Sequence, residues 1–167
     1  MRNALIAAAA TVVALFLSTA SGKELRFPSP DSALAAIYHY SDSAPDLVVS
    51  ITFVDSAGHR LFGDDYADRD YRPAKGHWSA SGRFFVYTLN SRGGHSPWHK
   101  PFVVADTQTR GCTRESDLGA GDCISDFRLS GRDTISYKIL DRSKDDWSED
   151  IPGIPVQFSL SQKLATQ

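Results

Sequence analysis

Short runs of alternating apolar and polar residues constrain the fold of this chain more than any other feature. In residues 47–54 every odd position is apolar, and Ser50 and Thr52 stand between the apolar positions. In residues 154–160 every even position is apolar. A period of two places successive side chains on opposite faces of an extended chain. These segments are therefore predicted to be β-strands with one buried face.

Further strands are predicted at 59–62, 83–89, 101–105, 127–129 and 135–139. Turn-forming residues at 55–58 and 130–133 stand between two pairs of these segments, so each pair is predicted to form a hairpin. The segment 83–89, with the sequence RFFVYTL, is apolar on both faces. That pattern indicates a central strand that is covered on two sides.

One helix is predicted near the start of the domain. Ser29, Pro30 and Asp31 have the order of a helix start, and apolar residues at helical spacing follow. The helix is expected over about residues 30–40. Regular alternation of strands and helices is lacking, so we expect a mostly β protein: an antiparallel β-sandwich or small barrel of seven to eight strands with one short N-terminal helix.

The segment Trp78–Thr88, with the sequence WSASGRFFVYT, resembles the motif that opens a strand in the blades of TolB-type β-propellers. The resemblance covers 11 residues. A propeller needs at least four blades of roughly 40 residues each, which exceeds the length available here. A turn at Ser81 and Gly82 that leads into a buried strand accounts for the motif, and no function is inferred from the resemblance.

The first 20 residues have the order of a secretory signal. Arg2 precedes an apolar run from Ala4 to Leu17, and small residues follow from Ser18 to Gly22. The run is shorter than the roughly 20 residues that a membrane-spanning helix needs. We therefore expect residues 1–20 to be removed and 21–167 to form a single β-rich domain. The processed protein is expected to lack a membrane span and to be periplasmic or secreted.

Cys112 and Cys123 are the only cysteines. Cysteines of exported chains usually pair in an oxidising compartment, so a disulfide bond between them is expected. It would close a polar loop and contribute roughly 3 kcal/mol in the chain-entropy model. The spacing differs from the C-x-x-C of redox-active pairs, which argues against a redox function.

The balance of charges excludes one large class of partner. The formal net charge is −2, with 18 Lys and Arg against 20 Asp and Glu. Binding to nucleic acid requires a surplus of cationic side chains that neutralise phosphates. We expect no nucleic-acid partner.

The least ordinary segment is the connection Ser91–Lys100 between two predicted strands, because hairpin connections usually have two to five residues. Its glycines permit close approach of a partner's backbone, its tryptophan offers a large rigid contact surface, and its histidines and arginine supply polar contacts. The candidate binding residues are Arg92, Gly93, Gly94, His95, Trp98 and His99. The alternative is that Trp98 plugs the open end of the sandwich and the histidines bond to loop carbonyls.

Metal binding and catalysis have weaker signals. His95 and His99 could hold zinc together with His77 or an aspartate, although Pro97 between them argues against a helix. The acidic runs 64–70 and 141–150 could hold calcium, but both contain basic residues, as solvated loops do, and neither has EF-hand spacing. No cofactor is expected. A nucleophile elbow is absent, so we lean against an enzyme, although serine, histidine and acidic residues could still converge in space.

These features favour an exported protein that binds another macromolecule through the 91–100 loop. The leading hypothesis is an inhibitor or immunity-type protein that acts on an envelope-directed enzyme, with its protein partner in the cell envelope or outside the cell. The first alternative is a carbohydrate or cell-wall binding module in which Trp78, Trp98, Tyr66 and Tyr71 stack on sugar rings. The second is a metal-assisted hydrolase that uses His95 and His99.

Overall fold

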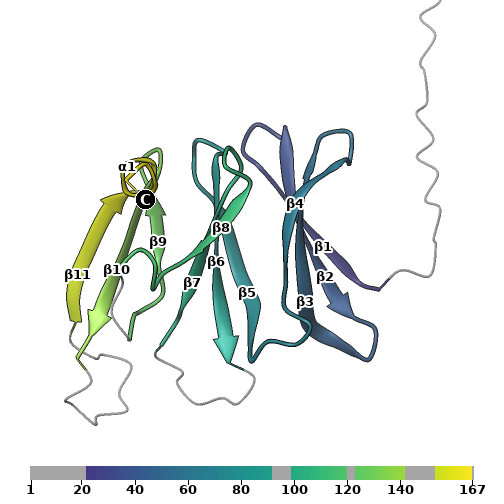
Figure 1. Cartoon of the computed structure of the whole chain (residues 1–167), viewed down its shortest axis with the longest axis horizontal. Coiled ribbons are helices and arrows are strands. Elements are labelled where there is room, and N and C mark those ends of the chain that lie inside the picture. Colours follow the sequence, from purple (N-terminus) through teal and green to yellow (C-terminus); the bar gives the residue numbers. More distant parts are fainter. Residues whose placement is uncertain (1–21, 92–98, 120–122, 142–152, 167) are drawn as a thin grey trace, which may run out of the picture.

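The computed structural model describes residues 22–91, 99–119, 123–141 and 153–166. Its described part is mostly β, with eleven strands in three antiparallel sheets and one short helix. The three sheets stand side by side (Figure 1). This arrangement agrees with the predicted β class and antiparallel pairing. It does not confirm the expected sandwich or barrel of seven to eight strands, because the described residues form three sheets, eleven strands and no closed barrel.

Each sheet is a meander in which strands that are consecutive in sequence are also neighbours in space. The first sheet consists of β1 (Glu24–Pro28), β2 (Leu34–Ser41), β3 (Ala44–Asp55) and β4 (Arg60–Asp65). The middle sheet consists of β5 (Tyr71–Trp78), β6 (Phe84–Ser91), β7 (Phe102–Asp106) and β8 (Gly111–Arg114). The third sheet consists of β9 (Arg128–Ser130), β10 (Thr134–Leu140) and β11 (Gly153–Ser159), and α1 (Leu160–Leu164) follows it.

Two apolar cores hold the sheets together, one on each face of the middle sheet. The alternate residues Phe85 and Tyr87 of β6 lie in the first core, between the first and middle sheets. Phe84 and Val86 of the same strand lie in the second core, against the third sheet and α1. The prediction of a central strand covered on both faces is thereby confirmed.

Most of the predicted core positions are confirmed as well. The apolar phase of the predicted strands places seven residues inside, Phe158 among them, and the other six are buried: Ile51, Phe53, Phe85, Tyr87, Ile135 and Tyr137. Phe158 on β11 is only half-buried at the margin of the second core. It lies on a strand whose second neighbour is missing from the described part, so less protein covers it.

The predicted helix over 30–40 is wrong, because residues 34–41 form the strand β2. The polar residues that indicate a helix start build a tight turn instead. The Ser29 hydroxyl contacts the Asp31 carboxylate at 2.6 Å, and Asp31 accepts a hydrogen bond from the amide of Ala33. A capping side chain satisfies free backbone amides equally well in a turn and in a helix. The helix that does form, α1, lies at the other end of the domain.

The turn before β2 and the turn before β6 have the same construction. In each, a serine amide donates to the carbonyl of the first residue of the following strand, at 2.9 Å from Ser29 and 2.8 Å from Ser79. Three residues later the backbone is left-handed, with φ of 57° at Ser32 and 72° at Gly82. The segment that resembles a propeller blade therefore has a structural counterpart one sheet earlier, which its sequence does not reveal.

Candidate functional site

The predicted binding loop lies between the end of β6 at Ser91 and the start of β7 at Phe102. Five of its six candidate residues, Arg92, Gly93, Gly94, His95 and Trp98, lie outside the described residues. His99 is described and half-buried. Its Nδ1 accepts a hydrogen bond of 3.3 Å from the amide of Ile124, as expected of a loop histidine that bonds to backbone. The structure therefore fixes the end of the loop but not its contact surface.

A cleft of about 250 Å³ opens beside the start of this loop, between the first and middle sheets. Tyr40, Asp46, Leu47 and Val48 line it from the first sheet, and Arg72, Pro73, Ala74, Asn90 and Ser91 line it from the middle sheet. These residues lie where β2 and β6 end and where β3 and β5 begin. We call this side of the molecule the cleft end; it is the lower end in Figure 1.

The cleft combines an apolar lining with charged and polar groups. Arg72 is only 4% exposed, and its Nη2 donates to the carbonyl of Ala67 at 2.7 Å. Asp46 stands at the rim with an exposed carboxylate, 4.0 Å from the ammonium of Lys23. Tyr71, which is 36% exposed, lies opposite Ser91 in the register of β5 and β6. Such a cleft can receive a polar side chain of a partner against an apolar floor.

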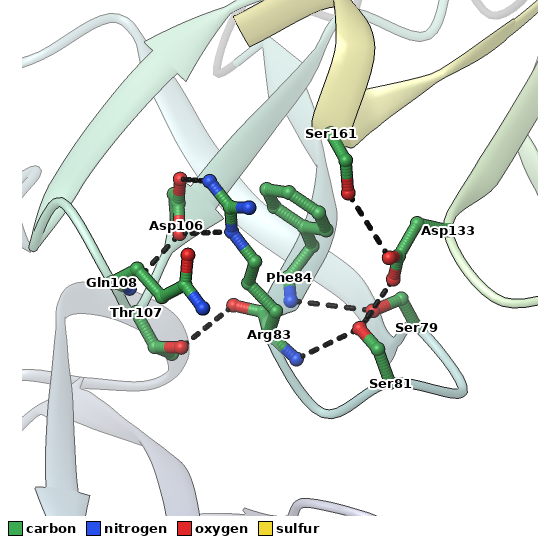
Figure 2. A network of polar contacts seen from close by, with 9 residues as sticks. All are labelled: Ser79, Ser81, Arg83, Phe84, Asp106, Thr107, Gln108, Asp133 and Ser161. Atoms are coloured by element: carbon green, nitrogen blue, oxygen red, sulfur yellow. Dashed lines mark hydrogen bonds and ion pairs between the residues drawn. The ribbon is translucent and has the colours of Figure 1, made fainter. Parts of the chain in front are cut away.

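At the opposite end of the stack, which we call the turn end, polar groups bind one another (Figure 2). Ser81, in the turn before β6, donates its hydroxyl to the carboxylate of Asp133, which stands just before β10. The Ser161 hydroxyl of α1 donates to the other oxygen of Asp133 at 3.1 Å. These bonds join the middle sheet to the third sheet and to α1.

The second half of this network is an ion pair within the middle sheet. Arg83 donates from Nε and Nη2 to the two carboxylate oxygens of Asp106, at 2.9 and 2.6 Å (Figure 2). Burial alone would raise the pKa of Asp106, but the hydrogen bonds from Arg83 and from the Gln108 amide outweigh burial and hold it below its ordinary value. The polar groups of this network form hydrogen bonds with one another, so we assign the network a structural role at the turn end.

A second polar cluster lies at the edge of the first core. The hydroxyls of Tyr66 and Tyr87 are 2.9 Å apart, and Tyr66 donates to Asp64 at 2.7 Å. Arg69 pairs with the same carboxylate at 3.0 Å. Burial raises the pKa of both tyrosines. Asp64 belongs to an acidic run considered for calcium, but here it binds the protein itself.

Metal-ligating residues are not gathered anywhere in the part of the chain that the structure describes: no group of three or more His, Cys, Asp or Glu side chains could hold an ion. Most of the second acidic run, from residue 142 to 150, lies outside this part, as does His95. The zinc and calcium hypotheses thus gain no support from the described residues.

The expected disulfide bond is not formed, and Cys112 and Cys123 are free cysteines. Cys112 stands opposite Ala105, a residue of the first core, in the register of β7 and β8. The carbonyl of Cys123 accepts a hydrogen bond from Leu140 of the third sheet, and the following residue lies in the second core. The two thiols are separated because Cys112 belongs to β8 of the middle sheet, opposite a residue of the first core, whereas the backbone of Cys123 pairs with the third sheet.

We expect the Cys112 thiol to react slowly at neutral pH. Although the residue as a whole is exposed, desolvation of its thiol and the nearby Asp64 carboxylate raise the pKa of Cys112 to about 11. Only the thiolate is nucleophilic, so at pH 8 alkylation should be more than about tenfold slower than for a small-molecule thiol. Iodoacetamide labelling of Cys123→Ser, followed by mass spectrometry, measures this rate. Labelling as fast as that of free cysteine would contradict the described environment.

Two of the four aromatic residues proposed to stack on sugar rings pack in the first core or against it. Tyr66 is fully buried. Trp78 packs against the first core, and its Nε1 donates to the carbonyl of Phe27 at 2.9 Å. Tyr71 is exposed, and Trp98 lies outside the described residues. Sequence reasoning overrated Trp78 and Tyr66 because aromatic residues that fill a core cannot be distinguished by type from those that bind sugars.

The chain matches no protein-family model, no curated protein and no solved structure. Within the described residues, no helix is long and apolar enough to cross a membrane. Functional inference for this chain therefore rests on its own residues.

Proposed function

We propose that this chain is an exported binding protein that recognises another macromolecule with its cleft end. In its specific form, the protein is an inhibitor or immunity-type protein that acts on an envelope-directed enzyme. The observation that carries the proposal is the cleft between the first and middle sheets, which adjoins the long connection after β6. The chemistry of the cleft and the length of the connection favour the same end of the molecule.

The construction of the scaffold supports recognition by preformed geometry. The middle sheet packs on both faces, so the strands that line the cleft are anchored by buried residues such as Leu89, which is 2% exposed and adjacent to Asn90. A site held by rigid strands loses little conformational entropy on binding, and the free energy of contact is then available as affinity.

The distribution of polar groups supports the choice of the cleft end. At the turn end Arg83 pairs with Asp106, and Ser161 donates to Asp133. At the cleft end the carboxylate of Asp46 and the ring of Tyr71 reach solvent. An exposed aromatic residue beside charged groups is typical of a recognition surface.

Export supplies the setting for this function. We propose that cleavage occurs near Ala20 to Gly22 and that the processed domain acts in the periplasm or outside the cell. The intact mass of protein recovered from the periplasm or the medium should correspond to a chain that lacks about the first 20 residues. A full-length mass of the exported material would contradict processing at this place.

The binding proposal is tested by affinity capture from envelope extract, with three variants compared with the parent. Asp46→Lys reverses an exposed charge at the rim, and Ala74→Phe fills the cleft; each should lower retention of the partner by about tenfold or more. Gln108→Lys places a new charge on an exposed residue of the turn end and serves as the control. It should retain the partner as the parent does.

Thermal midpoints of the same variants separate binding from stability. Asp46 is exposed, so Asp46→Lys should leave the midpoint unchanged while retention falls. Retention that is unchanged in both cleft variants, or lost equally in Gln108→Lys, would contradict recognition by the cleft end. Retention on peptidoglycan or polysaccharide, in place of a protein, would favour the carbohydrate-binding alternative.

A further inference from the structure

The first sheet carries a row of polar side chains on the face turned away from the first core. Ile51 and Phe53 of β3 point into that core, so Thr52 between them points to the opposite face. On β2, His39 follows the core residue Tyr38 and shares this face. Glu24 of β1 is directly opposite His39 in the register and therefore also lies there.

These three side chains form a continuous hydrogen-bonded chain. His39 Nδ1 is 3.0 Å from Oε1 of Glu24, and His39 Nε2 is 3.0 Å from Oγ1 of Thr52. A carboxylate can only accept, so in the neutral imidazole the proton is on Nδ1. The lone pair on Nε2 then faces Thr52 and can accept the hydroxyl proton.

The row is accessible to solvent and is extended by a cation on the fourth strand. The side chains of His39 and Glu24 are 31% and 47% exposed. Thr52 is opposite Gly63 in the register of β3 and β4. A Cβ on Gly63 would lie 3.3 Å from Nη2 of Arg60, so the guanidinium stands over the glycine, next to Thr52.

We propose that this row is a second, catalytic site in which Thr52 is the nucleophile of an acyl-transfer reaction on small esters. An acid, a base and a hydroxyl within hydrogen-bond reach, the base oriented by the acid, are the arrangement that activates a hydroxyl for attack. The site shares no residue with the cleft. It goes beyond the binding function and does not depend on it.

The reaction has two balanced steps. Thr52 Oγ1 attacks the ester carbonyl as its proton passes to His39 Nε2, and the ester C–O bond breaks when His39 returns that proton to the leaving alcohol. Water then attacks the acyl-threonine, giving a proton to His39, which passes it back to Thr52 as the carboxylic acid leaves. The net reaction is ester plus water to acid plus alcohol, and Glu24 stabilises the imidazolium formed in each step.

Arg60 determines the class of ester that binds best. A guanidinium next to the nucleophile attracts an anionic group on the substrate, and the absence of a side chain at Gly63 lets the guanidinium lie close over the strand there. The preferred substrate is therefore a small ester with a carboxylate, such as a half-ester of a dicarboxylic acid.

Two probes test the site on the full domain. A fluorophosphonate reports the nucleophile, because its fluoride leaves as the hydroxyl oxygen bonds to phosphorus, and peptide mass spectrometry locates the adduct. The nitrophenyl half-ester of succinic acid, compared with nitrophenyl acetate, reports the preference for an anion. We expect the adduct on Thr52 and faster cleavage of the half-ester, with the preference lost in Arg60→Met.

Substitutions show whether the Thr52 hydroxyl is labelled because His39 activates it or only because it is exposed. Thr52→Val preserves shape and should abolish the adduct, whereas His39→Gln and Glu24→Gln should each slow labelling by about tenfold or more. Ser50→Ala is the matched control, because Ser50 lies opposite His39 in the register and on the same face, whereas the hydrogen bond of His39 Nε2 is made with Thr52. It should label at the parental rate. Absence of an adduct on Thr52, with a serine hydrolase labelled in parallel, or a rate that His39→Gln leaves unchanged, would overturn the proposal.

Discussion

Replacing Phe85 by alanine is expected to lower the free energy of unfolding by about 3–5 kcal/mol, because it leaves a cavity in the first core. Phe85 is fully buried in the middle sheet. Its ring lies within about 6 Å of five aromatic rings: Phe27, Tyr38, Phe53, Trp78 and Tyr87. Loss of the ring removes contacts to both sheets at once. Urea unfolding of the parent and the variant measures the difference.

Two further alanine variants calibrate this result. Leu25→Ala, at a side chain that is 45% exposed, should change stability by less than about 0.5 kcal/mol. Phe158→Ala should cost less than Phe85→Ala, since Phe158 is half-buried. If Phe85→Ala unfolds at the same urea concentration as Leu25→Ala, the assignment of Phe85 to the first core is wrong.

Arg83→Met should destabilise the domain by about 2–3 kcal/mol at pH 7. The side chain of Asp106 is 4% exposed, and that of Arg83 is 25% exposed. Removing the guanidinium leaves a buried carboxylate without its cationic partner, whereas methionine keeps most of the packing volume. Breaking a buried pair in this way costs more than breaking a surface pair.

The pH dependence of this variant gives a second readout. In the parent, the pKa of Asp106 is below its ordinary value, so the pair contributes stability above about pH 4 and loses it as the pH falls through the folded-state pKa. In Arg83→Met, the guanidinium no longer opposes the effect of burial on the pKa of Asp106. Protonation of Asp106 then removes the buried charge. The difference in stability should therefore be largest at pH 7 and shrink towards pH 3.

Arg69→Met is the matched control, because it removes an exposed arginine from a carboxylate on the surface of the first core. The side chains of Arg69 and Asp64 are 42% and 17% exposed, so both partners of this pair are more exposed than Arg83 and Asp106. Its loss should cost less than about 1 kcal/mol. If the two arginine substitutions lower the free energy of unfolding equally at every pH, the buried Arg83–Asp106 pair contributes no more to stability than the more exposed pair.

The alternation of apolar residues predicted the strands that have one wet face. The run at 47–54 lies within β3, and the run at 154–160 lies in β11 except for Leu160, which begins α1. The run at 83–89, which is apolar on both faces, forms most of the central β6 from Phe84 onward. These predictions succeed because burial of one face imposes a period of two on the sequence. Conversely, β8, with the sequence GCTR, has no apolar alternation, since this short strand packs at an edge.

The number of sheets could not be predicted, because it depends on which faces meet. Residues 34–38 are predicted to be helical because the apolar residues Leu34, Ile37 and Tyr38 recur at helical spacing. In the structure Tyr38 points into the first core and Ile37 to the opposite face, and pairing with β1 and β3 overrides the local preference. The sequence pattern predicts neither β1 nor β2, so it does not predict that four strands form a first sheet separate from the middle sheet.

The candidate sites are assembled by register and packing, which spacing along the chain does not record. Asp46 and Arg72 line one cleft from two different sheets. Glu24, His39 and Thr52 meet across three neighbouring strands. By contrast, the unusual length of the 91–100 connection is evident from the sequence. This connection begins at the end of the molecule at which the cleft opens.

Hydrogen exchange of the captured complex tests recognition by the cleft end most directly. Partner binding should slow exchange in peptides that contain 46–48 and 72–74, which line the cleft, and leave the turn at 79–83 unchanged. Slower exchange confined to 79–83 and 130–133, with the cleft strands unaffected, would place the partner at the turn end and contradict the proposed function.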